Sequence, residues 1–105
     1  MADAKVWLLD EPAANLDYGN TRRLMERLQT LAGDGYLILQ SIHAPETAVF
    51  FSTRILALQD GQLIADGKPD VLDETLMERL YGVKVRRREL REPDGVFPVF
   101  LPVRR

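Results

Sequence analysis

The chain has 105 residues, a net charge of −2, 46% hydrophobic and 29% charged residues, and no cysteine. This is the composition of one small globular domain; it excludes a disulfide framework or a thiolate metal site and argues against general nucleic-acid binding. No apolar stretch approaches the length of a membrane-spanning helix, so any membrane association is expected to run through a partner protein and not by direct insertion.

The first predicted strand, at about residues 5–10, ends in two adjacent acids. Its apolar residues 6–9 predict a fully buried strand, and Asp10, Glu11 and Pro12 follow at once. Open α/β sheets bind ligands at the C-terminal ends of their strands, where one carboxylate can hold Mg²⁺ and a second can orient or deprotonate a water. The alternative is that these two acids, the acid pair, only accept hydrogen bonds from nearby backbone N–H groups.

A helix at about residues 19–32 and a second apolar strand at 36–42 are predicted next. The helix carries one apolar stripe with the spacing of a buried face, made of Leu24, Met25, Leu28, Leu31 and Ala32. His43, the only histidine, follows the second strand. We expect the two strands to be parallel and joined by a right-handed helical crossover, which places His43 at the same sheet edge as the acid pair.

The rest of the chain predicts short elements separated by strong turn signals. These elements are a helix at about 46–51, a hairpin of strands 54–58 and 63–65, a helix at about 74–80, and a second hairpin of strands 83–90 and 96–103. Pro45 suits the first turn of a helix, and Asp60-Gly61 is a two-residue hairpin turn. Pro98 and Pro102 confine the last strand to a sheet edge.

The segment 6–17, Val-Trp-Leu-Leu-Asp-Glu-Pro-Ala-Ala-Asn-Leu-Asp, followed by His43, resembles the Walker B, D-loop and switch-histidine region of an ATP-binding-cassette (ABC) ATPase. That resemblance implies that Asp10 holds Mg²⁺ through water and that Glu11 polarises the hydrolytic water. It implies that His43 touches the terminal phosphate and that Asp17 helps form the contact between two cassettes that sandwich ATP. Asp17 is equally suited to be the N-cap of the following helix, and both interpretations stay open.

Two motifs of that family are absent from the sequence. One is the glycine-rich phosphate loop, Gly-x4-Gly-Lys-Ser/Thr, and the other is the Leu-Ser-Gly-Gly-Gln signature. The chain therefore resembles only the C-terminal part of a cassette ATPase. Residues 60–69, Asp-Gly-Gln-Leu-Ile-Ala-Asp-Gly-Lys-Pro, and Tyr-Gly-Val at 81–83 resemble the ATPases of iron-siderophore, haem or cobalamin importers.

The resemblance implies an α/β fold: a partial P-loop NTPase (RecA-like) sheet with flanking helices, followed by C-terminal hairpins. We expect a single domain over residues 1–105, with a core remnant at 1–82 and a hairpin at 83–105. The intact family domain binds ATP and Mg²⁺, works with a second cassette and with membrane permease subunits, and is cytoplasmic, peripheral to the inner membrane. For this chain alone we expect no bound cofactor and no ATP hydrolysis; the alternative function is a non-catalytic assembly module.

The missing part of the cassette also leads to a prediction about assembly. In related P-loop folds the phosphate-loop strand lies between the strands expected here at 36–42 and 53–59. Its absence would leave unpaired backbone groups along both strands and would expose apolar side chains, namely Leu37, Leu39, Ile55 and Leu58. Either the two strands pair directly or a second copy covers them, and we expect self-association.

Overall fold

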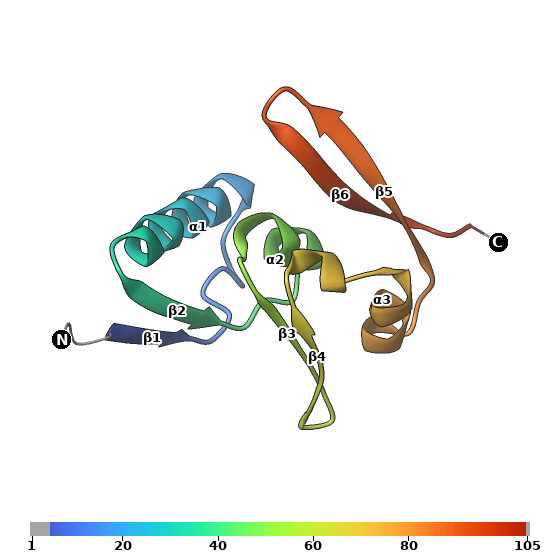
Figure 1. Cartoon of the computed structure of the whole chain (residues 1–105), viewed down its shortest axis with the longest axis horizontal. Helices are drawn as coiled ribbons and strands as arrows, with labels where there is room; N and C mark the ends of the chain where they lie inside the picture. Colours follow the sequence, from blue (N-terminus) through green and yellow to red (C-terminus); the bar gives the residue numbers. More distant parts are fainter. Residues whose placement is uncertain (1–4, 105) are drawn as a thin grey trace. The chain divides into compact units, whose positions relative to one another are not determined.

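The computed structural model describes residues 5–104, which form two compact units that divide between Ala44 and Pro45 (Figure 1). The described strands make three two-stranded sheets, one in the first unit and two in the second. Helices accompany the strands in both units, which confirms the predicted α/β class. Within residues 5–104 no helix is both long and apolar enough to cross a membrane.

The first unit is a strand–helix–strand crossover. Its elements are β1 (Lys5–Leu9), α1 (Tyr18–Gly33) and β2 (Tyr36–Gln40). β1 and β2 pair in parallel, as predicted, and α1 packs against their sheet through Met25 and Leu28, the two fully buried side chains of the stripe. This topology brings the C-terminal ends of both strands to one edge (Figure 1).

The face of the β1–β2 sheet that bears the even-numbered apolar residues of β1 is open to solvent. Val6 lies opposite Leu37 and Leu8 opposite Leu39, and all four side chains are half or more exposed. The prediction of fully buried strands is therefore wrong for this chain, because α1 covers one face only. β2 also ends at Gln40, two residues earlier than predicted, and among the described residues β1 is its single strand partner.

The second unit contains every remaining predicted element, with a short 3-10 turn that was not predicted. Its elements are α2 (Pro45–Phe51), β3 (Ile55–Gln59), β4 (Gln62–Gly67), η1 (Pro69–Val71), α3 (Glu74–Tyr81), β5 (Val85–Glu92) and β6 (Gly95–Pro102). β3 and β4 are antiparallel around Asp60 and Gly61, whose φ angles are 52° and 76°. Positive φ at both positions gives the hairpin turn that the sequence predicted.

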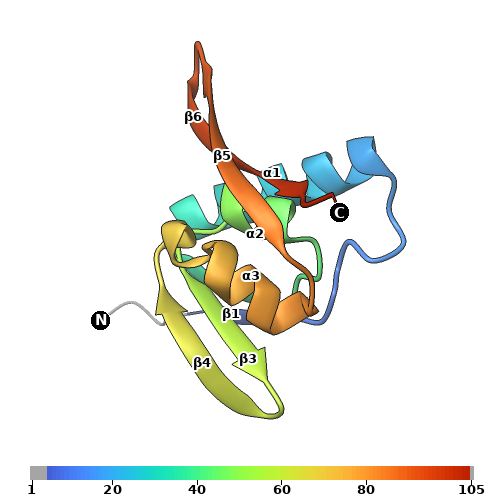
Figure 2. The same cartoon turned by 90° about the vertical axis from the view of Figure 1, so that its right-hand side faces the viewer.

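The core of the second unit lies where α2, the β3–β4 hairpin and α3 meet (Figure 2). Its buried members are Val49, Ala57, Leu72, Leu76 and Met77. Ile55 packs against this cluster and is half-buried, so the prediction that it is exposed is wrong, whereas Leu37, Leu39 and Leu58 are exposed as predicted. The distinction follows from α3, which covers one side of the hairpin.

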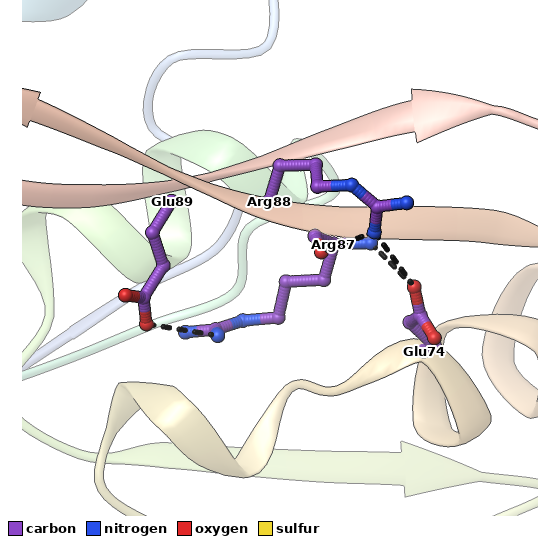
Figure 3. A network of polar contacts seen from close by, with 4 residues as sticks. All are labelled: Glu74, Arg87, Arg88 and Glu89. Carbon is purple, nitrogen blue, oxygen red and sulfur yellow. Dashed lines mark hydrogen bonds and ion pairs between the residues drawn. The ribbon is translucent and has the colours of Figure 1, made fainter.

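The β5–β6 hairpin is attached to α3 and α2 by polar and aromatic contacts. The backbone N–H of Arg87 donates to Glu74 Oε2 at 2.7 Å, and Arg88 Nη1 lies 3.9 Å from the same oxygen (Figure 3). Phe97 of β6 stacks on Phe50 of α2, with ring centroids 5.0 Å apart. These contacts explain the positions of Arg87 and Arg88 in the arginine-rich strand without a bound ligand.

Candidate functional site

The acid pair leaves β1 in an unusual backbone conformation. Glu11 has φ 44°, which is left-handed, although it is not a glycine and precedes Pro12. A side chain in that region costs roughly 1–2 kcal/mol, and a following proline restricts the backbone further. Such strain persists where neighbouring contacts hold it, and it clusters at functional sites.

His43 meets Glu11 at the edge where both parallel strands end. Its Nε2 atom pairs with Glu11 Oε1, and the two side chains are 82% and 38% exposed. The predicted clustering of the histidine with the acid pair is therefore confirmed, since both lie past the C-terminal ends of β1 and β2. The exposure leaves the pair open to a ligand from solution.

Ser41 joins the two strand ends and was not singled out from the sequence. Its Oγ accepts the backbone N–H of Glu11 at 2.8 Å and donates to Asp10 Oδ1 at 2.8 Å. The available signal was a hydroxyl residue directly after an apolar strand that ends near the acid pair. That signal is weak, because serine commonly follows strands for reasons of turn geometry alone.

Asp17 caps α1, and its side chain contacts that helix. Its Oδ1 accepts the backbone N–H of Asn20 at 2.8 Å, as an N-cap carboxylate does. The N-cap interpretation is thus confirmed, while a role between two cassettes stays a prediction.

The donor atoms suit Mg²⁺ in type, but the described residues supply few of them. Ser41 contacts Oδ1 of Asp10 and His43 contacts Oε1 of Glu11, so the second oxygen of each carboxylate takes no part in these two contacts. Mg²⁺ is commonly held by one or two carboxylates together with waters and substrate phosphates. Within residues 5–104 no group of three or more His, Cys, Asp or Glu side chains is arranged to hold a metal, so further ligands would have to come from outside these residues.

The chain is similar to ATP-binding proteins of bacterial import systems. It is 40% identical over 97 residues to the hemin import ATP-binding protein HmuV of Burkholderia thailandensis, covering 90% of this chain and 35% of that protein. It is 37% identical over 90 residues to the phosphonates import ATP-binding protein PhnC of Hydrogenovibrio crunogenus, covering 85% and 33%. The chain thus spans about a third of the length of the curated relatives it matches.

The fold is also similar to that of a solved structure, described as an inward-facing ABC transporter of the metal-chelate type. The TM-score is 0.78 at 20% identity, covering 95% of this chain and 41% of the other. This likeness confirms the α/β fold, which corresponds to part of that chain. No family model matches the sequence.

Proposed function

We propose, from the relation of this chain to the ATP-binding subunits of ABC importers, that it acts as the C-terminal part of such a subunit. The observation that carries the proposal is the contact of His43 with Glu11 beside Asp10, at the edge where two parallel strands end. Ligands of open α/β sheets bind at that edge. The chain's similarity to importer ATP-binding proteins over 90% of its length supports ATP hydrolysis coupled to transport as the reaction class.

In that role each side chain has a defined part. Asp10 holds Mg²⁺, directly or through water, with the carboxylate oxygen that Ser41 does not engage. Glu11 accepts a proton from the attacking water or orients it, and His43 orients Glu11 and contacts the terminal phosphate. Mg²⁺, when bound with ATP, neutralises charge on the phosphates. Asp17 caps α1 and contributes to the surface that meets a second cassette.

This chain provides only part of a catalytic site. Tight binding of ATP in P-loop proteins depends on backbone N–H groups and a lysine that surround the phosphates, and the sequence lacks that loop. The isolated chain therefore binds ATP weakly at best and does not hydrolyse it. A complete site requires a polypeptide that provides the phosphate loop and covers the open β1–β2 face.

A chimera tests the proposal. The 97-residue matching segment of the Burkholderia thailandensis hemin import protein is replaced by that of this chain, and steady-state ATP hydrolysis is measured beside the isolated chain. We expect hydrolysis by the chimera, none by the isolated chain, and a loss of about 10²-fold or more in Glu11→Gln, the effect of removing a general base. A folded chimera without activity, or an isolated chain whose hydrolysis Glu11→Gln abolishes, would overturn the proposal.

The partners and location follow from the same assignment. The subunit is cytoplasmic and peripheral to the inner membrane through permease subunits, it pairs with a second cassette, and it binds no nucleic acid. Its cargo is of the metal-chelate class, supported by the hemin import relatives. Phosphonate import relatives of similar identity are consistent with cargo being chosen by other subunits.

A second candidate is a non-catalytic assembly module, favoured by the exposed apolar face of Val6, Leu8, Leu37 and Leu39. The edge of β2 that no strand within residues 5–104 pairs also favours it. Such a surface favours self-association of the isolated chain. Sedimentation over a concentration series tests this, and a strictly monomeric species at high micromolar concentration would contradict it. A module of this kind associates but leaves the chimera inactive, so the two candidates predict different results.

A further inference from the structure

The side chain of Ser41 forms a bridge between the two strand ends that carry the site. Its Oγ accepts one hydrogen bond, from the Glu11 N–H, and donates another, to Asp10 Oδ1, both at 2.8 Å. A hydroxyl can accept from a backbone N–H and donate to a carboxylate at the same time, whereas an ammonium or a carboxylate cannot do both. Ser41 therefore contacts both acids with a single atom.

The backbone around Ser41 fixes where that atom lies. The Ser41 N–H donates to the carbonyl oxygen of Leu9 at 3.1 Å, which continues the β1–β2 pairing one step past the end of β2. The Cα position of Ser41 is thus set by the sheet and not by the loop that follows. Its hydroxyl is held against the backbone of Glu11, at the residue with the left-handed φ of 44°.

We propose that Ser41 is a positioning residue that holds Glu11 in its left-handed conformation and selects which oxygen of Asp10 remains for a ligand. The Glu11 N–H would otherwise turn toward water, and the residue could relax to the extended conformation that a following proline favours. That relaxation would swing the Glu11 carboxylate away from His43. The catalytic meaning of this role rests on the proposed function; the positioning itself does not.

Because Ser41 is exposed, the alternative is that its hydrogen bonds are ordinary surface bonds that do not affect the conformation of Glu11. The two differ in what happens at Glu11 and His43 when the hydroxyl is removed. A surface bond that water replaces leaves the Glu11–His43 contact unchanged. If the bond positions Glu11, its loss also breaks the Glu11–His43 contact.

Nuclear magnetic resonance on the full 105-residue chain separates these cases, without nucleotide. The measurements are the hydrogen-exchange rate of the Glu11 amide and the nuclear Overhauser effects between the Glu11 side chain and the His43 ring. The variants are Ser41→Ala, which removes the hydroxyl, and Ser41→Thr, which keeps it. Ser52→Ala, the same chemical change in the second unit, is the matched control.

We expect Ser41→Ala to speed Glu11 amide exchange by about fivefold to tenfold, the effect of losing one hydrogen bond, and to abolish the Glu11–His43 cross-peaks. Ser41→Thr restores both, and Ser52→Ala changes neither. Unchanged cross-peaks in a folded Ser41→Ala chain would overturn the proposal, as would a Ser41→Thr chain that behaves like Ser41→Ala. If Ser41→Ala does not fold, the Glu11 amide exchange rate of the unaltered chain is the test. Exchange at the rate of an unstructured peptide would overturn the proposal. An inactive chimera would contradict the proposed function but would not change the interpretation of these measurements.

Discussion

Because one face of the β1–β2 sheet is open, two leucine-to-alanine substitutions in the first unit are expected to lower its stability by different amounts. Leu28 of α1 is 6% exposed, whereas Leu37 of β2 is 61% exposed. Truncating a buried leucine costs about 2–5 kcal/mol, because transfer free energy is lost and a cavity remains. Leu37 has roughly two fifths of its surface covered in the single chain, so Leu37→Ala is expected to cost about 1 kcal/mol at protein concentrations too low for self-association.

Urea unfolding followed by tryptophan fluorescence measures both costs in the right unit. Trp7, the only tryptophan, lies in β1. The centroid of its ring is 5.8 Å from that of Tyr36. With a slope of about 1 kcal/mol per molar urea for so small a unit, Leu28→Ala lowers the midpoint by about 3 M or unfolds the unit outright. Leu37→Ala lowers the midpoint by about 1 M.

Equal losses in the two variants would refute this reasoning. They would mean that the face bearing Leu37 is covered in solution, as it would be in a self-associated chain. Repeating the titration at a tenfold lower protein concentration separates that case, because a cost that depends on association changes with concentration.

Three further outcomes are expected from other positions. Asp17→Ala removes the α1 N-cap and lowers stability by about 1 kcal/mol in urea unfolding, whereas Asp17→Asn, which also caps, is nearly neutral. Gly82→Ala, at φ 72° after α3, lowers the stability of the second unit by about 1 kcal/mol in thermal unfolding. Arg54 donates to Asp66 at 2.7 and 2.6 Å, and this hydrogen bonding lowers the pKa of the Asp66 carboxyl. Because the folded pKa lies below the unfolded value, the pair stabilises the fold above about pH 4 and loses that effect as the pH falls, and Arg54→Gln flattens this acid dependence.

Each of these outcomes has a clear contrary result. An Asp17→Asn chain as unstable as Asp17→Ala would show that charge at the helix start matters more than the cap. A neutral Gly82→Ala would mean that the end of α3 tolerates another conformation. An acid dependence that persists in Arg54→Gln would assign it to other carboxylates.

Local signals in the sequence predicted most elements, because each signal acts over a few residues. The apolar stripe of α1, the proline that begins α2 and the turn at Asp60-Gly61 are of this kind. The parallel pairing followed from the same information, since neighbouring strands joined by a helical crossover of this length are usually parallel. The site residues Asp10, Glu11 and His43 came to one edge for that reason.

The tertiary structure alone decided features that depend on what lies against a residue. Val6 and Leu8 read as buried in sequence, yet they are exposed, because burial requires a covering element that the described chain does not provide for that face. Ile55 is half-buried because α3, distant in sequence, packs on its hairpin. The bridge by Ser41 and the left-handed Glu11 depend on the register of β1 against β2. No local pattern encodes that register, since it is set by side-chain packing between strands separated by a whole helix.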